Sequence, residues 1–251
     1  MKKENLTVIS QENLAPRIYR MKLKGESVRS MLTPGQFVHL KLGGRHPLLR
    51  RPISICDVEE DQLSIIYRVE GQGTSMLAEK KDGDTVDALG PLGEGFPITP
   101  SDDTALLIGG GVGIPPLYYL AKQLYDKGKR VKIILGFRRQ EEMFLTEAFS
   151  RFGEVFVTTE NGSCGTRGFV TDAIAKAGEF DVFYTCGPKP MLRAVEKAAG
   201  TNGYISLEER MGCGVGACLA CVCDLKEAET DKSYVKACKD GPVFQAGEVV
   251  L

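Results

Sequence analysis

The sequence predicts an antiparallel β-barrel, then a doubly wound parallel sheet with helices, then a small cysteine-rich segment. Three observations predict this β plus α/β class. Short alternating runs fill the first hundred residues, apolar runs alternate with helical patterns from Thr104, and five of the eight cysteines fall between Cys213 and Cys238. A chain of 251 residues is long enough for roughly two domains and a small appendage. We expect domains at 1–99, 100–208 and 209–251.

Six strands are expected in the first domain because six runs show period-two alternation or β-branched content. Six consecutive strands are typical of a small antiparallel barrel. One helix is expected at 74–81, with Thr74 as its N-cap. The Gly- and Pro-rich segment 90–103 predicts the domain boundary. The six runs are residues 6–10, 17–23, 36–42, 51–58, 62–69 and 85–90.

Strands and helices alternate in the second domain, which predicts a parallel sheet covered on both faces. Its strands are nearly continuous apolar runs, as strands buried on both faces should be. The expected strands are 104–109, 131–137, 154–160, 181–187 and 204–209, and the expected helices are 116–129, 141–152 and 190–199. The last forty residues show neither pattern clearly.

Charge and composition narrow the function classes. The formal net charge is −1, so no long-range field favours nucleic acid or an anionic membrane. The N-terminal segment 1–10 lacks the apolar core of a signal peptide, and no run reaches the eighteen apolar residues of a membrane span. We therefore expect a cytoplasmic protein with reduced thiols, in which clustered cysteines indicate metal or redox chemistry.

The cysteine cluster has the spacing C-x4-C-x2-C at Cys213, Cys218 and Cys221, and Cys238 follows. This is the plant-type [2Fe–2S] arrangement. Four thiolates must converge from one loop whose backbone passes close to the sulfides, which favours the glycines between the cysteines. A four-cysteine zinc site and inert thiols remain as alternatives. Cys223 has the parity of a strand residue that points the other way, so we expect it to be a packed free thiol.

Two segments indicate phosphate binding. Arg51 begins a strand, and Gly73 and Thr74 open the helix of the barrel, so a cation and a helix N-terminus could neutralise a pyrophosphate. In the second domain, a glycine-rich turn lies between a buried strand and a helix, where a dinucleotide phosphate can approach the backbone. The turn contains Gly109, Gly110, Gly111 and Gly113. It is not a full G-x-G-x-x-G because Pro116 occupies the final glycine position.

Other candidate residues leave more than one interpretation open. Cys186 is expected at the carboxyl end of a buried strand, where ligands bind in open α/β sheets, or it is an inert core thiol. Arg138 and Arg139 favour a 2′-phosphate, whereas the acidic residues that follow favour a free ribose. His39 is expected on a strand, and neither it nor His46 is paired with a nucleophile, so hydrolysis has no support.

The motifs together resemble the ferredoxin–NADP reductase superfamily. Arg-Pro-x-Ser at 51–54, the Gly-Thr helix start, "GGGVGIPP" and "CGPKPM" carry the resemblance. It implies a flavin-binding first domain and a nicotinamide-binding second domain. It places Cys186, with Gly187 and Pro188, beside the nicotinamide. It implies that the flavin is held by Arg51, Pro52, Ile53, Ser54, Tyr67, Arg68, Val69, Gly73 and Thr74.

The segments "EERMGCGVGACLACVC" and "KACKDGPVF" resemble a narrower family, the electron-transfer subunits of NAD-linked dihydroorotate dehydrogenase. This resemblance implies FAD, a [2Fe–2S] cluster held by Cys213, Cys218, Cys221 and Cys238, and NAD. It also implies a partner subunit with FMN that oxidises dihydroorotate in pyrimidine biosynthesis, in a heterotetramer of two chains of each kind. The sequence departs from the family at Pro116 and at Arg138–Arg139, both in the nucleotide site.

Two other functions stay open from the sequence. One is the flavin subunit of a sulfide dehydrogenase or of a ferredoxin–NADP oxidoreductase, whose sequences are similar. The other belongs to a different class, a zinc-stabilised nucleotide-sensing module without turnover. The absence of a second small-substrate motif favours a chain that passes electrons to a partner.

Overall fold

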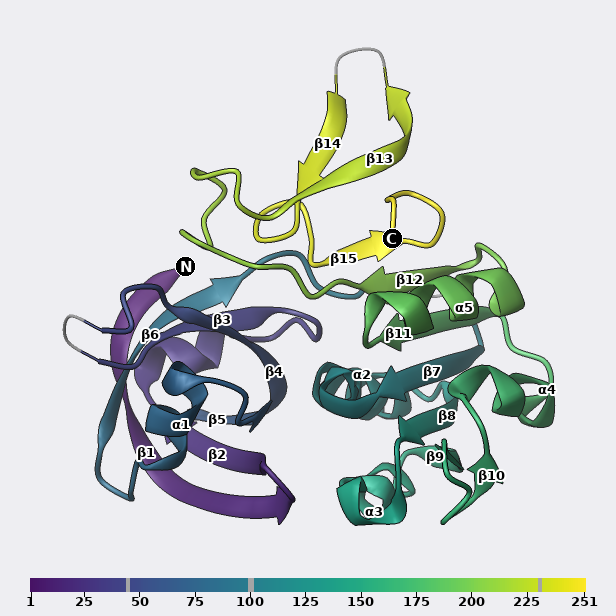
Figure 1. The fold of residues 1–251 in the computed structure, drawn as a ribbon, viewed down its shortest axis with the longest axis horizontal. Coiled ribbons are helices and arrows are strands. Elements are labelled where there is room, and N and C mark those ends of the chain that lie inside the picture. The colour runs from purple at the N-terminus through teal and green to yellow at the C-terminus, as the bar shows by residue number, and fades with distance from the viewer. Residues whose placement is uncertain (44–45, 99–101, 230–231) are drawn as a thin grey trace.

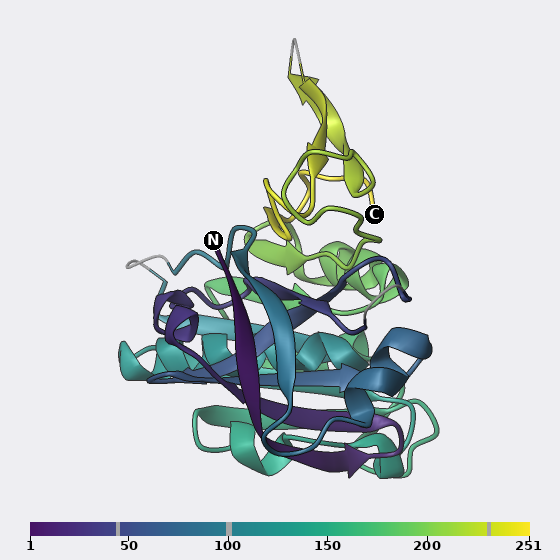
Figure 2. The same ribbon diagram turned by 90° about the vertical axis from the view of Figure 1, so that its left-hand side faces the viewer.

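The computed structural model describes residues 1–43, 46–98, 102–229 and 232–251. It contains a barrel, a mixed sheet with helices and a C-terminal hairpin, which extends away from the other two parts (Figures 1 and 2). The expected boundary between residues 99 and 100 lies outside the described residues.

The barrel is closed and antiparallel, in the strand order β1-β2-β5-β4-β3-β6, as the sequence predicted. Alternate side chains fill its interior, among them Leu6, Met21, Val38 and Ile65. A short 3₁₀ helix, Glu26–Ser30, follows β2. The strands are β1 (Lys2–Ala15), β2 (Ile18–Lys24), β3 (Phe37–Lys41), β4 (Arg51–Glu59), β5 (Gln62–Arg68) and β6 (Thr85–Leu92).

The helix of the barrel starts earlier than the sequence indicated. Helix α1 spans Gln72–Ala78, and Gly71 is its N-cap. Thr74 lies in the first turn instead, where its hydroxyl accepts the backbone N–H groups of Glu70 (3.0 Å) and Gly71 (3.2 Å). A threonine in the first turn can accept the free backbone N–H groups at a helix start, just as an N-cap threonine can. The residue type alone therefore predicted a helix start two residues too late.

The second domain is a seven-stranded sheet in the order β10-β9-β8-β7-β11-β12-β15. Its first six strands are parallel, and the order reverses between β7 and β11, which makes a topological switch point at their carboxyl ends. The strands are β7 (Thr104–Gly110), β8 (Arg130–Phe137), β9 (Gly153–Thr159), β10 (Thr166–Arg167), β11 (Val182–Cys186), β12 (Gly203–Ser206) and β15 (Val243–Gln245).

Helices cover both faces of this sheet, so the doubly wound prediction is confirmed. Along β7, Leu107 packs with α2 on one face, and the next residue, Ile108, packs with α5 on the other. The helices are α2 (Ile114–Asp126), α3 (Thr146–Phe149), α4 (Ile174–Ala177) and α5 (Lys189–Ala199).

The prediction of one long helix at 141–152 is wrong. The segment forms a 3₁₀ turn at Gln140–Glu142 and the single turn α3, because Leu145 between them has a φ of 61°. A left-handed residue cannot continue an α-helix.

The cysteine-rich segment packs against both the barrel and the mixed sheet. After the cluster loop, β13 (Val222–Glu229) and β14 (Lys232–Lys236) form a hairpin, and β15 adds an antiparallel edge to the sheet at β12. Its buried side chains share one core with Phe37 and Leu92 of the barrel and Leu192 of α5. The cluster loop is therefore held against the barrel and the sheet together.

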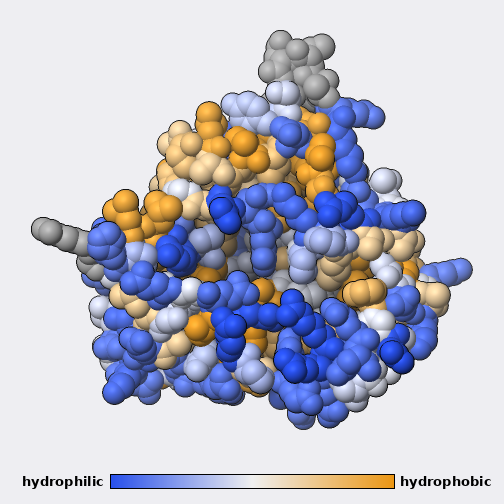
Figure 3. Space-filling view, viewed as in Figure 1, coloured by the Kyte–Doolittle hydropathy of each residue, from blue (hydrophilic) through white to orange (hydrophobic). Residues whose placement is uncertain are grey.

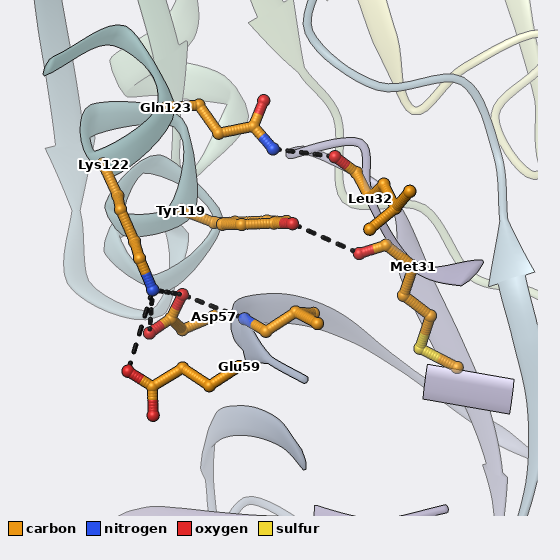
Figure 4. Close-up of polar contacts among 8 residues, drawn as sticks. Met31, Leu32, Asp57, Glu59, Tyr119, Lys122 and Gln123 are labelled. Carbon is orange, nitrogen blue, oxygen red and sulfur yellow. Dashed lines mark hydrogen bonds and ion pairs between the residues drawn. The ribbon is translucent and has the colours of Figure 1, made fainter. Parts of the chain in front are cut away.

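Polar contacts from α2 fix the sheet to the barrel (Figure 4). The Lys122 ammonium donates to the Asp57 carboxylate at 3.0 and 3.2 Å and lies 3.7 Å from Glu59. One residue further along, the Gln123 side chain donates to the Leu32 carbonyl at 2.7 Å. These contacts set the position of the switch point relative to the barrel strands.

In the ranges that the structure describes, no helix combines the length and the apolar character that crossing a membrane requires.

Candidate functional site

A groove of about 720 Å³ runs from the outside of the barrel to the carboxyl ends of β11 and β12. Of the residues that the resemblance assigned to flavin, seven line it: Arg51, Pro52, Ile53, Ser54, Tyr67, Arg68 and Thr74. We call it the flavin groove. Val69 does not line it and packs partly buried against the barrel core. Gly73 does not line it either, but a Cβ at Gly73 would overlap the Arg51 guanidinium, so the predicted cation and helix start do lie together.

A second groove, of about 540 Å³, lies over the carboxyl ends of β7 and β8. Gly110, Gly111, Gly113 and Pro188 line it, and we call it the nucleotide groove. Gly113 is needed for close packing, because a Cβ there would overlap the Cys186 carbonyl. Two predicted residues lie behind the wall: Gly109 faces Ile114 and Leu117 of α2, and Gly187 packs on Met191.

The two grooves meet at a common wall. Arg68, Glu70, Val112 and Glu208 line both of them. The Nε atom of Arg68 is buried and has no hydrogen-bond partner among the described residues, and the same holds for the Thr158 hydroxyl in the nucleotide groove. Buried polar atoms in proteins are nearly always paired, so these two fit a polar ligand in the grooves.

Glu208 is a site residue that the sequence did not identify. It lies two residues after β12 as the first of two glutamates, a pattern equally typical of a solvated strand end. The residue is exposed at the groove wall, yet desolvation of its carboxyl, and then the charge of Glu70, raises the pKa of Glu208, although Arg68 opposes the shift. Its carboxyl group therefore holds a proton to a higher pH than a glutamate in free solution does.

Cys186 lies in the flavin groove rather than in the nucleotide groove. It is buried, and burial followed by the charge of Glu208 raises the pKa of its thiol. A neutral thiol at this place can pack against a ring without adding charge.

Each of the four predicted cluster cysteines accepts a backbone N–H on its sulfur. The N–H of Cys213 donates to Cys218 (3.3 Å), that of Cys238 to Cys221 (3.4 Å) and that of Gly216 to Cys238 (3.1 Å). Cys213 accepts two, from Val215 (3.4 Å) and Ala217 (3.3 Å). N–H groups aimed at sulfur stabilise thiolate charge, so the loop fits an iron–sulfur cluster.

The pKa values of the thiols separate Cys213 from Cys223. Although burial acts to raise it, the backbone N–H bonds from Val215, Cys218 and Ala217 lower the pKa of Cys213 to about 6. By contrast, burial and the charge of Glu209 raise the pKa of Cys223 to about 11, and its thiol lies 3.9 Å from that carboxylate. A neighbouring carboxylate disfavours the thiolate that a metal ion requires, so the surroundings of Cys223 do not favour metal binding.

Among the described residues, no three His, Cys, Asp or Glu side chains form a group that could hold one metal ion. A structural zinc ion needs four ligands around one point, whereas a [2Fe–2S] cluster divides four thiolates between two irons.

The flavin groove reaches the cluster loop. Met211, two residues before Cys213, and Pro242, four residues after Cys238, both line it. The chain therefore arranges three sites in a row: the nucleotide groove, the flavin groove and the cluster loop.

Comparisons with known families match two of these regions. Residues 208–250 match the family described as the iron-sulfur cluster binding domain of dihydroorotate dehydrogenase B, and residues 107–197 match the oxidoreductase NAD-binding domain.

Three curated relatives carry the name dihydroorotate dehydrogenase B (NAD(+)), electron transfer subunit. The protein from Geobacillus kaustophilus is 56% identical and that from Bacillus caldolyticus 55% identical, both over 256 residues that cover 99% of each chain. The protein from Bacillus mycoides is 53% identical over 258 residues that cover 100% of each chain.

Solved structures share the fold. An NADH-dependent reduced ferredoxin-NADP oxidoreductase, studied for flavin-based electron bifurcation, superposes with a TM-score of 0.86 at 31% identity, over 98% of this chain and 90% of that one. A ferredoxin NADP+ reductase from Neisseria gonorrhoeae with bound FAD and NADP gives a TM-score of 0.68 at 16% identity, over 84% and 95%, which shows the fold alone. With relatives above 50% identity along its whole length, the chain belongs to the family of dihydroorotate dehydrogenase B electron transfer subunits.

Proposed function

We propose that this chain passes electrons from a dihydroorotate-oxidising partner subunit with FMN to NAD⁺, through its own [2Fe–2S] cluster and FAD. The observation that carries the proposal is the contiguity of three sites: Glu208 and Arg68 line both grooves, and Met211 and Pro242 connect the flavin groove to the cluster loop. When bound, the flavin exchanges a hydride with the nicotinamide and single electrons with the cluster, while the protein holds and orients these groups.

The proposed division of labour follows the expected domains, with flavin on 1–99, nucleotide on 100–208 and cluster on 209–251. Arg51, close to Gly73 at the start of α1, supplies the cation for the flavin pyrophosphate. Gly110, Gly111 and Gly113 let the nucleotide phosphates approach the N-terminus of α2. Tyr67 has its hydroxyl bonded to Gln11 at 2.7 Å, which fixes the ring in the wall of the flavin groove.

Cys213, Cys218, Cys221 and Cys238 are the proposed cluster ligands. Burial and the neighbouring Cys221 raise the pKa of Cys238 to about 12, so this thiol loses its proton when metal binds. Cys218 is exposed, whereas Cys221 and Cys238 are buried. The Cys218 side of the cluster therefore faces outward, toward a partner.

The partner is proposed to dock over that side. Val215 and Leu219, which flank Cys218, are 40% and 50% exposed, and the space-filling view shows apolar side chains gathered on the C-terminal part of the chain (Figure 3). Apolar side chains exposed together mark protein–protein contacts. By the family resemblance, the assembly is a heterotetramer of two chains of each kind. It would act in the cytoplasm, where thiols such as these stay reduced.

NAD is the proposed nucleotide, in preference to NADP. Glu142 and Glu160 line the nucleotide groove together with Arg138. Arg139 donates to Glu142 at 2.9 Å, so this carboxylate already neutralises the Arg139 guanidinium, which makes Arg139 a weak partner for a 2′-phosphate. The ratio of kcat/KM for NADH and NADPH, with a dye as acceptor, tests the preference: it should favour NADH.

Co-expression with the neighbouring genes tests the proposed function directly. The purified complex should contain an FMN subunit and reduce NAD⁺ when dihydroorotate is added. A large iron–sulfur partner and ferredoxin reduction instead would support the ferredoxin–NADP oxidoreductase alternative, which the solved relative at 31% identity represents. A colourless chain that contains zinc would support the nucleotide-sensing module.

A further inference from the structure

His39 is a buried side chain that the proposed relay does not use. It lies on β3, where Val38 and Leu40 point into the barrel core. His39 and Phe37 point the opposite way, toward the C-terminal segment, and their rings meet edge to face with centroids 6.5 Å apart. The exposed fraction of His39 is 0%.

Neither ring nitrogen of His39 has a hydrogen-bond partner among the described residues. The backbone of Cys213 and that of Arg50 lie close enough to the ring to raise its pKa against the stronger lowering effect of burial, but neither meets the distance and angle of a hydrogen bond to a ring nitrogen. A buried polar atom without a hydrogen bond is destabilising and rare in native folds, so it needs an explanation.

The pattern of unpaired atoms points to a ligand. In the described part of the chain, four buried side-chain nitrogen or oxygen atoms have no hydrogen-bond partner, although Nε of Arg68 lies 4.0 Å from the Glu70 carboxylate. Two of them, Arg68 Nε and the Thr158 hydroxyl, belong to residues that line the nucleotide groove. The other two are Nδ1 and Nε2 of His39, and the site next to them is the cluster loop.

The cluster loop passes directly against the imidazole of His39. Gly214, directly after Cys213, has a φ of 73°, and a Cβ at this position would overlap Nδ1 of His39. Glycine thus serves two purposes here: it allows the left-handed turn, and it lets the loop backbone approach the imidazole closely.

We propose that His39 is a positioning residue for the iron–sulfur cluster, which donates a ring N–H to a sulfur of the cluster or of Cys213 and thereby raises the reduction potential of the cluster. The inference rests on the proposed cluster function. An imidazole carries at least one N–H in either protonation state, so the donor is always present. Hydrogen bonds to cluster sulfurs stabilise the added negative charge of the reduced form, and the barrel of the flavin domain supplies this one.

The test replaces His39 in the full chain, loaded with its cofactors. His39→Phe keeps a planar ring without an N–H, and His39→Gln keeps an N–H on a flexible side chain. EPR-monitored redox titration should give the His39→Phe cluster a more negative potential than the wild type and altered g values, at unchanged iron and sulfide content. The His39→Gln cluster should lie between the two. His46→Leu, which changes the chain's one other histidine, exposed in a loop, should match the wild type.

A wild-type potential and spectrum in His39→Phe would overturn the inference and would identify the ring as filler between barrel and loop. If the His39→Phe chain does not bind the cluster, His39→Leu is titrated in its place. A more negative potential with altered g values would support the inference, and a wild-type potential and spectrum would overturn it. Iron and sulfide analysis of the wild-type chain tests the proposed function separately, because that analysis does not depend on His39.

Discussion

At the scale of single residues, backbone hydrogen bonds distinguish the four proposed cluster ligands from Cys223. Cys213, Cys218, Cys221 and Cys238 all accept backbone N–H groups on sulfur, whereas Cys223 lies within reach of the Glu209 carboxylate and the Cys221 carbonyl. The backbone N–H groups therefore support the four ligands that the spacing in the sequence predicted, and the assignment of these four, with Cys223 left out, stays a proposal.

Cys218→Ala tests this assignment against Cys223→Ala. We expect Cys218→Ala to lose iron and labile sulfide, because a cluster cannot complete its four thiolates, while the flavin and NADH-to-dye activity remain. Cys223→Ala is the matched control and should keep full iron content. Iron analysis and the flavin spectrum measure both variants, and full iron in Cys218→Ala would contradict the ligand set.

The carboxyl of Glu208 predicts a small pH-dependent effect on stability, although the residue is exposed at the groove wall. The pKa of Glu208 is raised in the folded chain, chiefly because the groove wall desolvates the carboxyl, so its contribution to stability is present at low pH and is lost as the pH rises through the folded pKa. Glu208→Gln removes this titrating group. Because solvent screens an exposed carboxyl, the thermal midpoint of Glu208→Gln should exceed the wild type only slightly at pH 8, and the gap should close as the pH falls toward 5.

Glu147, which lines neither groove, provides the control for Glu208. Glu147→Gln should leave the midpoint close to the wild type at every pH. A gap between Glu208→Gln and the wild type that stays constant from pH 8 to pH 5 would show that the pKa of the Glu208 carboxyl is not raised by folding.

The sequence could not reveal Glu208 as a site residue. A strand end with two glutamates does not indicate that the first of them lines two grooves, because that position depends on Arg68 of the barrel and the turn before α2 meeting at the same wall. Cys213 and its neighbours could be predicted because their chemistry depends on spacing within one loop.

At the scale of secondary-structure elements, α2 links the two large domains. Its Lys122 pairs with Asp57, whose side chain is only 13% exposed, and Gln123 caps the Leu32 carbonyl (Figure 4). An amphipathic helix pattern predicts a buried face, but it does not tell which partner that face meets.

The pair of Lys122 and Asp57 should show coupling in a double-mutant cycle. Lys122→Met leaves a mostly buried carboxylate unpaired, so we expect a loss of about 1–3 kcal/mol in unfolding free energy. The double variant Lys122→Met/Asp57→Asn should lose less than the sum of the single variants. Lys127→Met, on the exposed end of the same helix, is the control. Strict additivity measured by urea unfolding would show that the contact contributes nothing.

Elements with a strong internal pattern were predictable, and those that depend on tertiary contacts were not. The barrel strands alternate cleanly, and β7 is apolar throughout. The prediction of a helix at 141–152 was wrong because Leu145 adopts a left-handed conformation, which is not expected for a leucine. The hairpin of β13 and β14 was not predicted because charged residues interrupt the alternation of apolar and polar residues in its strands.

At the scale of the whole molecule, the order of the three sites is the finding with most functional weight. The resemblance implied which cofactors bind, but the adjacency of Met211 and Pro242 to the flavin groove is a product of the fold, since β15 draws the C-terminal segment onto the sheet edge. The exposed side of the cluster loop is then the side that remains for a partner.

A charge on that side should separate the subunits. Leu219→Glu puts a carboxylate into the proposed apolar contact, so binding to the FMN subunit should weaken at least about tenfold. NADH-to-dye activity should persist because the flavin and nucleotide grooves are untouched. Tyr125→Glu, exposed at the end of α2, is the control. Unchanged affinity for the partner in Leu219→Glu, by surface plasmon resonance, would place the docking face elsewhere.

Metal analysis of the anaerobically purified complex tests the central claim most directly. For each chain of this kind, the account predicts about two irons and two labile sulfides, and an EPR signal typical of a [2Fe–2S] cluster after chemical reduction. Zinc in place of iron, or no metal on the four cysteines, would contradict it.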